Sequence, residues 1–256
     1  MTHSTSILPA STHSNLNFNQ DSKFVLHYFN YHGLGATIRA LLCFGEVLWE
    51  NQIQPFPEWM ETKPTTPFGC IPILKETVIS TGEEFAIPES QAIERYLGRK
   101  FGLMGDTLRE QTLNDIFYAQ ATVLWVKYTE TVLFNFDDVR EKALGLFMHR
   151  LASWVESCEA HLKENGNTGH FVDNKTTLAD IRTAALLDIM MALDTDSVLS
   201  ATASPGLWKL KQTIDTHPTY AAWRRSPGFE SIDQLSEASI APMRIPLRMA
   251  KAHIFS

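Results

Sequence analysis

The chain has 256 residues, 44% of them hydrophobic, which is enough to bury one large core or two smaller ones, and the usual domain size of about 100–200 residues favours two. The formal net charge is -7 and the lysines and arginines are scattered. This argues against a nucleic acid partner, because phosphate binding needs a clustered basic surface. The sequence contains no run of about 18 apolar residues, the length that a transmembrane helix requires.

The three cysteines, Cys43, Cys70 and Cys158, are odd in number and show no Cys-x-x-Cys spacing. This pattern is typical of free thiols in a reducing compartment, so we predict a cytoplasmic protein. Residues 1–22 are rich in serine, threonine, asparagine and histidine and contain no arginine. They resemble neither a secretory signal nor an arginine-rich transit peptide, and we interpret them as a disordered lead-in.

The first part of the chain alternates between strand and helix patterns. Aromatic and branched residues predict the strands, apolar residues at helical spacing predict the helices, and glycine or proline marks their ends. The expected elements are a strand at 24–29, a helix at 36–44, a strand at 47–54, a polar loop at 55–68, a strand at 71–75, a hairpin turn at 81–82 and a helix from 88 to 100. This order, β-α-β followed by β-β-α, predicts a thioredoxin-like domain at residues 23–102.

After this domain the sequence changes to amphipathic helices without a strand signal. The helices are expected at 108–136, 139–162, 178–193, 207–216 and 219–225. Together they predict an all-helical domain at residues 106–230. The third helix begins with a capping box, in which the Thr177 hydroxyl caps the amide of Asp180 and the Asp180 carboxylate reaches back.

Residues 231–256 form a C-terminal extension. Its last part combines Arg244, Arg248 and Lys251 with apolar residues and contains two prolines, which prevent a single regular helix. We interpret this part as a strap on the protein's own surface, with contact to a membrane or a partner as the alternative.

Pro72 stands inside the apolar run Ile71-Pro72-Ile73-Leu74, which otherwise predicts a buried strand. Proline is tolerated only at the first residue of a strand, at a sheet edge or at a bulge, and bonds before proline are the ones that become cis. We therefore predict a cis bond between Ile71 and Pro72 that exposes the Ile71 backbone for pairing with a peptide-like ligand. An ordinary loop-to-strand proline is the alternative.

Several segments between residues 24 and 230, in the order in which the family has them, resemble the cytosolic glutathione transferases. The resemblance is strongest to the sigma class, which includes the haematopoietic-type prostaglandin D synthases. The matching segments are Leu26-His27-Tyr28-Phe29-Asn30 with Gly33 and Ile38-Arg39, the segment 63–74 with Ile71-Pro72, Glu89-Ser90-Gln91-Ala92-Ile93 with Arg95-Tyr96-Leu97, Thr177 to Asp180, and His217-Pro218 with Ala222-Trp223 and Ser226-Pro227. The resemblance implies glutathione as co-substrate, no metal, and a homodimer.

The resemblance implies that Tyr28 is the catalytic residue, and the chemistry agrees. The glutathione thiol has a pKa of about 8.5, so only a few per cent is the nucleophilic thiolate at neutral pH. A neutral tyrosine hydroxyl donates a stronger hydrogen bond to the thiolate than to the thiol, and each pKa unit gained is worth about 1.4 kcal/mol. Without the surrounding motif, Tyr28 is an aromatic residue at a strand end.

The other implied ligands surround the tripeptide. Ser90, at the start of its helix, suits the γ-glutamyl carboxylate because the helix dipole favours an anion there, and Glu89 suits the ammonium group. Lys63 and Trp59 are implied to hold the glycyl carboxylate, and the Ile71 backbone before Pro72 to pair with the cysteinyl unit. The alternatives are that Ser90 only caps its helix, that Glu89 is an acid placed there by the helix dipole alone, and that Lys63 is simply exposed.

The sequence departs from the family pattern in three places. Leu34 stands where a thiolate-stabilising arginine is typical, and its side chain donates nothing, although His32 is a candidate substitute. Cys70 stands where the family contacts glutathione through Gln or Lys, so it either fills space or places a thiol beside the tripeptide. The segment 119–123 lacks the acid that the family's fourth helix directs at the neighbouring subunit's site.

The resemblance therefore implies a transferase that conjugates glutathione to apolar electrophiles in detoxification. The electrophile pocket is expected to be built by Tyr31 and by the inner face of the fourth helix, with the tail as a further candidate. A glutathione-dependent isomerase or peroxidase, similar to the prostaglandin synthases, is one alternative. A non-catalytic binding or scaffold protein is the other, which Leu34 and Cys70 make plausible.

Overall fold

The computed structural model describes residues 21–133, 137–193 and 195–240. The lead-in up to residue 20 and the basic part of the tail, including Arg244, Arg248 and Lys251, lie outside the described residues. The chain divides into two compact units. The first contains the described residues up to Gly102 together with Ala222–Asp233, and the second contains Leu103–Ala221 and the described residues from Gln234.

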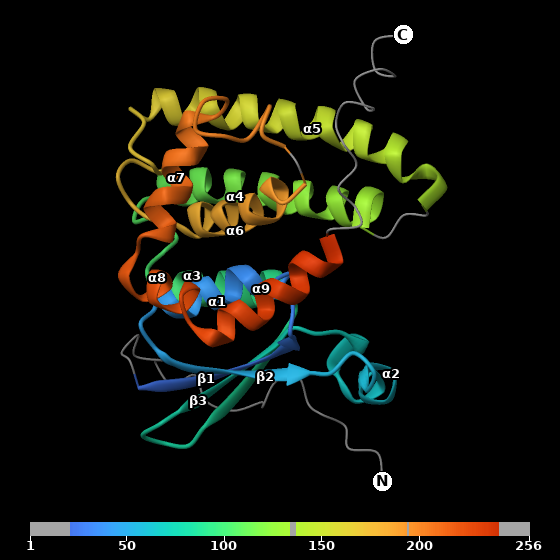
Figure 1. The fold of residues 1–256 in the computed structure, drawn as a ribbon. Helices are drawn as coiled ribbons and strands as arrows, with labels where there is room; N and C mark the ends of the chain where they lie inside the picture. The colour runs from blue at the N-terminus through green and yellow to red at the C-terminus, as the bar shows by residue number, and fades with distance from the viewer. Residues whose placement is uncertain (1–20, 134–136, 194, 241–256) are drawn as a thin grey trace. The chain divides into compact units, whose positions relative to one another are not determined.

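The first unit contains a four-stranded mixed sheet. Its strands are β1 (Ser22–Phe29), β2 (Leu48–Gln54), β3 (Ile73–Val78) and β4 (Glu84–Pro88), in the order β2-β1-β3-β4. Strand β1 is parallel to β2 and antiparallel to β3, and β3 is antiparallel to β4. Helices α1 (Gly35–Phe44) and α3 (Ser90–Lys100) cover one face of this sheet (Figure 1). The predicted thioredoxin-like order is confirmed.

The apolar patterns explain these elements. Alternate residues of β1, namely Phe24, Leu26 and Tyr28, are buried, as the two-residue period of a strand requires. Helix α1 buries Ile38 and Leu41 on its apolar side. The core of the first unit therefore lies between the sheet and the two helices.

The prediction of a polar loop at 55–68 is wrong in detail. This segment contains the short helix α2 (Trp59–Thr62) and two 3-10 turns, Lys63–Thr65 and Pro67–Gly69. Proline occupies the first turn of each 3-10 segment, where its missing N–H has no helical partner to lose, and the pieces stay short because no apolar stripe continues through them.

The peptide bond between Ile71 and Pro72 is cis, as predicted. Strand β3 begins two residues after Ile71, at Ile73, so the prediction that the strand started at residue 71 is wrong. Pro72 therefore precedes the ladder, and its missing N–H removes no strand hydrogen bond.

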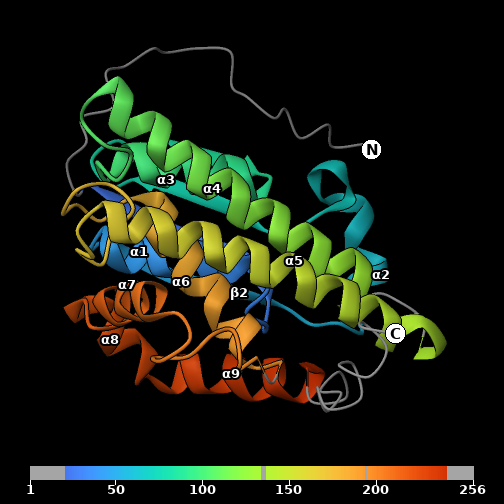
Figure 2. The ribbon, with the colours of Figure 1, turned by 90° about the horizontal axis from the view of Figure 1, so that it is seen from above.

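The second unit is helical. Helix α4 (Leu108–Tyr128) continues into the π-helical turn Thr129–Leu133, and α5 (Asp137–Glu164) runs beside α4 (Figure 2). Helices α6 (Leu178–Met191) and α7 (Pro205–Asp215) follow, and α6 is buried on nearly all sides. At the start of α6, Asp180 Oδ2 accepts the Thr177 N–H at 2.7 Å, so the backward reach expected of this carboxylate is present.

The last two described helices are α8 (Pro218–Arg224) and α9 (Pro227–Ile240). Helix α9 was missed, because the chain after residue 230 was interpreted as an extension. The sequence marks its start, because serine is a common helix cap and proline is common at the first helical position. In the structure the Ser226 hydroxyl accepts the Phe229 N–H at 3.2 Å, and Pro227 is the first residue of the helix. Within the described ranges, no helix is long and apolar enough to cross a membrane.

Candidate active site

The strand register brings several predicted site residues to one edge of the sheet. His27 pairs with Ile73 and Ile73 pairs with Pro88. Tyr28 follows His27, Ile71-Pro72 precedes Ile73, and Glu89-Ser90 follows Pro88. The end of β1, the start of β3 and the end of β4 therefore meet at this edge, which we call the candidate site edge.

Tyr28 is enclosed by the turn that follows β1. Only 7% of its surface is exposed, and its hydroxyl oxygen accepts the Leu34 N–H at 3.2 Å. Gly33 has φ +36, and a Cβ added there would lie 2.8 Å from the Tyr28 hydroxyl. The β1–α1 turn, residues 30–34, therefore needs glycine to approach the phenol. Leu34 thus contributes a donor through its backbone, a role that its side chain cannot provide.

Arg39 of α1 lies behind this turn. It is 1% exposed, and its guanidinium group donates to the carbonyl oxygens of Phe29 at 3.1 Å and Tyr31 at 2.9 Å and to Asn51 Oδ1 at 2.9 Å. Its Cζ atom is 5.8 Å from the centroid of the Tyr28 ring. The sequence marked Arg39 only as part of a motif, because its carbonyl partners are visible only in the folded turn.

The outer side of the β1–α1 turn is attached to the first turns of α9. His32 Nε2 is 3.2 Å from Asp233 Oδ1, and the Asn30 amide donates to the Ser231 hydroxyl at 3.0 Å. The predicted candidate substitute for the missing arginine, His32, is therefore engaged with an acid of α9. Tyr31, in the same turn, is partly buried, and this burial raises its pKa.

The backbone around the cis bond is arranged differently from the strand. Ile71 is buried but stands before the first ladder pair of β3. Within the described part of the chain, its backbone N–H and C=O make no hydrogen bond. The preceding residue, Cys70, is exposed, and its thiol donates to the Phe68 carbonyl at 3.3 Å. Cys70 therefore lies outside the core, and both expected roles, filling space beside the tripeptide and placing a thiol there, stay predictions.

The start of α3 supplies an anion-binding geometry. Ser90 is its first residue, and Glu89 precedes it with φ +71, a value that turns the chain sharply from β4 into the helix. The free N–H groups of the first helical turn and the positive end of the helix dipole lie beside the Ser90 hydroxyl. Glu89 is exposed at the same position.

Trp59 and Lys63 belong to the segment between β2 and β3. The Trp59 ring packs edge-on against Phe29, with centroids 5.4 Å apart, so Phe29 links it to the end of β1. Lys63 is exposed, and a Cβ added at Gly69 would lie 3.4 Å from its side chain. No ion pair holds Lys63 within the described residues.

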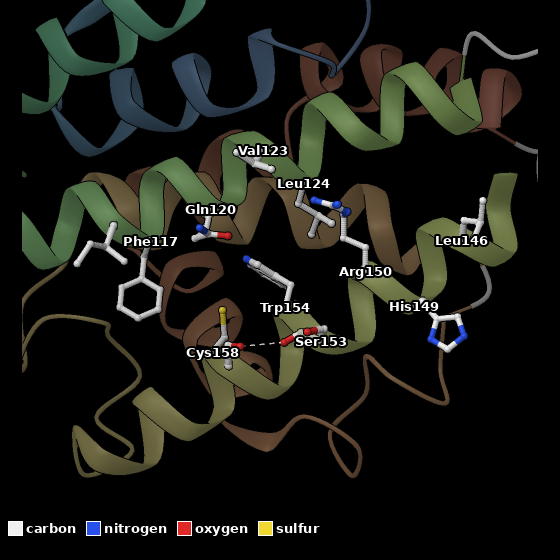
Figure 3. Close-up of a pocket in the computed structure, with 12 residues that line it drawn as sticks. Phe117, Gln120, Val123, Leu124, Leu146, His149, Arg150, Ser153, Trp154 and Cys158 are labelled. Carbon is white, nitrogen blue, oxygen red and sulfur yellow. Dashed lines mark hydrogen bonds between the residues drawn. The ribbon is translucent and has the colours of Figure 1, made fainter.

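A cavity of about 760 Å³ lies in the second unit between α4 and α5 (Figure 3). Its lining combines apolar residues with polar and charged ones. The lining includes Ile116, Phe117, Gln120, Val123, Leu146 and Trp154. None of the predicted glutathione ligands lines it, so it is a feature separate from the candidate site edge.

The comparisons with known proteins agree with this architecture. Residues 124–227 match the family model of the glutathione S-transferase C-terminal domain. The chain is 32% identical to glutathione S-transferase P of Caenorhabditis elegans, over 77% of this chain and 90% of that protein. It is 27% identical to hematopoietic prostaglandin D synthase of Gallus gallus, over 78% and 94%.

A solved structure of the sigma class glutathione transferase of Fasciola hepatica superposes with a TM-score of 0.69 at 25% identity, over 82% of this chain and 100% of that chain. The chain belongs to the glutathione S-transferase family. Within the family it is similar to sigma class transferases and to a prostaglandin D synthase, and membership implies glutathione as the co-substrate.

Proposed function

We propose that the protein is a glutathione transferase in which the Tyr28 hydroxyl stabilises the glutathione thiolate for attack on an apolar electrophile. The observation that carries this proposal is the hydrogen bond from the Leu34 N–H to the Tyr28 oxygen at the candidate site edge. A donor to the phenol oxygen polarises the O–H bond, and the polarised hydroxyl donates more strongly to a thiolate.

The remaining residues of the edge orient the tripeptide. The unpaired backbone of Ile71, before Pro72, offers a donor and an acceptor to the cysteinyl unit. Ser90 and the first N–H groups of α3 receive the γ-glutamyl carboxylate, and Glu89 receives the ammonium group. Lys63 and Trp59 hold the glycyl carboxylate, and Cys70 lies next to the cysteinyl binding position.

The role of Tyr28 is tested by Tyr28→Phe with a generic aryl halide as electrophile. The variant keeps the ring but removes the donor, so we expect a loss of about 10²-fold in kcat/KM and a higher pKa of the bound thiol. Tyr31→Phe removes a hydroxyl from the same turn and should leave the thiol pKa unchanged. Unchanged turnover by Tyr28→Phe would show that the assignment is wrong.

A second candidate function is suggested by the similarity to hematopoietic prostaglandin D synthase. The same bound thiolate could serve an isomerase or a peroxidase. Product analysis with a prostaglandin endoperoxide and with an organic hydroperoxide separates these reactions from conjugation. Isomerised product at a higher kcat/KM than any conjugate would favour the isomerase.

A non-catalytic glutathione-binding or scaffold role is the remaining alternative, and the Leu34 side chain favours it because it supplies no charge at the thiolate. A glutathione-affinity column distinguishes the alternatives. Retention without conjugating activity points to a binding protein, and failure to bind points to a scaffold.

We also propose that the protein acts in the cytosol as a homodimer whose contact includes the cavity between α4 and α5. Three of the residues that line this cavity, Ile116, Val123 and Leu146, are large, apolar and between 42% and 66% exposed. Grouped apolar exposure of this kind marks protein interfaces, and a two-fold contact needs only one such surface. The three cysteines are free thiols, which suits a reducing compartment.

The dimer is tested by measuring the molar mass of Val123→Glu and Leu146→Glu by light scattering. Each variant places a charge at the contact and should shift the mass toward the monomer. Leu108→Glu is the matched control, because Leu108 lies on α4 and is 80% exposed but does not line the cavity. A monomeric wild-type protein would contradict the proposal.

A further inference from the structure

The guanidinium group of Arg39 is a buried charge surrounded by neutral acceptors. Its three hydrogen-bond acceptors are two backbone carbonyls and the Asn51 amide oxygen. Within the described residues, no carboxylate lies within 4.0 Å of it. Burial lowers the pKa of Arg39 to about 10, with Tyr28 acting in the opposite direction, so the group is still a cation at neutral pH.

A buried cation without a counter-ion is costly, and such groups are normally paired or replaced. The other buried cation of the first unit follows this rule: Lys100 Nζ lies 2.8 Å from Glu76 Oε1. Arg39 departs from this rule. The anion that the proposed chemistry creates is the glutathione thiolate, which accepts a hydrogen bond from the Tyr28 hydroxyl. The ring of Tyr28 is 5.8 Å from the Arg39 Cζ atom.

We infer that Arg39 is a positioning residue for Tyr28, which holds the β1–α1 turn against the phenol and supplies the positive charge that Leu34 lacks. This inference rests on the proposed function. Arg39 acts through Tyr28 and the turn, because it is covered and does not reach the ligand side of the edge.

The geometry gives Arg39 two separate effects. First, its bonds to the carbonyls of Phe29 and Tyr31 fix both ends of the segment that carries the Leu34 N–H to the Tyr28 oxygen. Second, its charge favours negative charge on the phenol oxygen and on a thiolate bonded to it. The Arg39 Cζ atom is 5.8 Å from the centroid of the ring that carries the phenol oxygen. For charges roughly 6–10 Å apart in a partly buried site, we expect the second effect to be about one pKa unit, or about tenfold more thiolate at neutral pH.

Gly35 shows how closely the two side chains approach. A Cβ added at Gly35 would lie 2.7 Å from Tyr28 Cδ1 and 2.8 Å from Arg39 Nη1. The first residue of α1 therefore has to be glycine for the ring and the guanidinium group to occupy their positions on either side of it.

The other ionisable groups that face this corner have partners or carry no charge at neutral pH. Tyr31 is neutral, since burial raises its pKa. His32 is bonded to Asp233 of α9. On β2, Glu50 precedes Asn51 and so points to the opposite face of the strand, where it pairs with Lys23 at 3.5 Å. A change in acidity after removal of Arg39 is therefore assigned to Arg39.

The test uses Arg39→Met, which keeps the length of the side chain but removes the charge and the donors, and Arg39→Lys, which keeps a charge. Lys100→Met is the control, because it removes the other buried cation of the same unit. Two titrations are recorded for each protein: thiolate absorbance of the glutathione complex, and tyrosinate absorbance of the free protein, with Tyr28→Phe subtracted to isolate Tyr28.

For Arg39→Met we expect both titration midpoints to move to higher pH, the thiol by about one unit, with a tenfold lower kcat/KM at pH 6.5 and the wild-type value recovered at high pH. For Arg39→Lys we expect the midpoints to move less in the same direction, with kcat/KM at pH 6.5 lowered about threefold. Lys100→Met should lower the melting temperature without moving either midpoint.

Two results overturn the inference. One is a lower melting temperature for Arg39→Met with both midpoints unchanged. The other, which applies if Arg39→Met does not fold, is an Arg39→Lys protein with unchanged midpoints. Failure of the proposed function is recognised separately, because Tyr28→Phe would then leave the thiol pKa of the complex unchanged while the tyrosinate titration still reports on Arg39.

Discussion

The first unit contains two buried cations with opposite surroundings. Lys100, at the end of α3, pairs with Glu76 of β3, and the same carboxylate accepts hydrogen bonds from the Ser22 and Tyr96 hydroxyls. Arg39, on α1, has only neutral acceptors among the described residues. The first cation belongs to a closed network, whereas the charge of the second is not neutralised by its neighbours.

The difference indicates two uses of a buried charge. In the closed network the charges satisfy each other and attach α3 to the sheet, so the network contributes to the stability of the unit. Burial and the bond to Glu76 raise the pKa of Tyr96, so its hydroxyl is protonated at neutral pH and donates to Glu76. We infer that the field of Arg39 extends to Tyr28, because no carboxylate of the described residues lies within 4.0 Å of the guanidinium group.

The largest effect is expected when the closed network is opened. Glu76→Gln keeps an acceptor but removes the charge, so Lys100 becomes a buried cation among neutral groups, as Arg39 is. We expect a loss of about 3–5 kcal/mol in the free energy of unfolding, because breaking a buried pair leaves one charge uncompensated. Urea unfolding followed by tryptophan fluorescence measures it.

The double variant Glu76→Gln/Lys100→Met provides the control for this prediction. If the loss comes from the unpaired charge, removing Lys100 as well should restore part of the stability, with a coupling of about 2–3 kcal/mol. Strictly additive losses would show that packing, and not the charge, makes the network important. In each folded variant the thiol pKa of the glutathione complex should stay at the wild-type value.

A smaller effect is expected at Gly35. Alanine is the better helix former, by about 1 kcal/mol, but its Cβ would overlap with Tyr28 and Arg39. We expect Gly35→Ala to lower the free energy of unfolding by about 1–3 kcal/mol, as overpacking does, and to reduce kcat/KM with the aryl halide. Equilibrium unfolding and steady-state kinetics measure the two quantities.

Gly82→Ala is the matched control for Gly35→Ala. Gly82 has φ +73 and no atom within 4 Å of an added Cβ, so alanine there strains only the hairpin turn. It should lower stability with no loss of activity. A Gly35→Ala protein with wild-type stability and turnover would contradict the close approach of Arg39 and Tyr28.

Local rules predicted where the residues of the candidate site edge lie in the fold, whereas their roles came from the resemblance to the glutathione transferases and stay predictions. The period of β1 buries Tyr28, proline chemistry marks the bond after Ile71, and a helix start marks Ser90. The sequence could not identify the role of Arg39, since its partners are carbonyls of a turn whose path depends on Gly33 and Gly35. An arginine within an amphipathic helix is normally expected on the exposed side of that helix.

The same reasoning explains the errors in the fold. Helix α4 was predicted to continue to residue 136, but the described chain changes to a π-helical turn at Thr129–Leu133, and periodicity does not distinguish this turn from an α-helix. Helix α9 was missed although Ser226 and Pro227 mark its start, because the chain after residue 230 was interpreted as an extension. The segment 55–68 contains short helical pieces that are below the length at which an apolar pattern can be read.

The smallest effect is expected at His32, the other candidate for the missing positive charge. Its ring nitrogen is 3.2 Å from Asp233, whose side chain is 55% exposed, so the pair should contribute no more than about 1 kcal/mol. His32→Gln should therefore change the melting temperature slightly and leave the thiol pKa of the glutathione complex unchanged. Asp233→Asn is the partner control, since it removes the acid and keeps the imidazole. A thiol pKa that rises in His32→Gln as much as in Arg39→Met would assign the positive charge to the turn itself, and the contrast between the two buried cations would then no longer explain the acidity of the site.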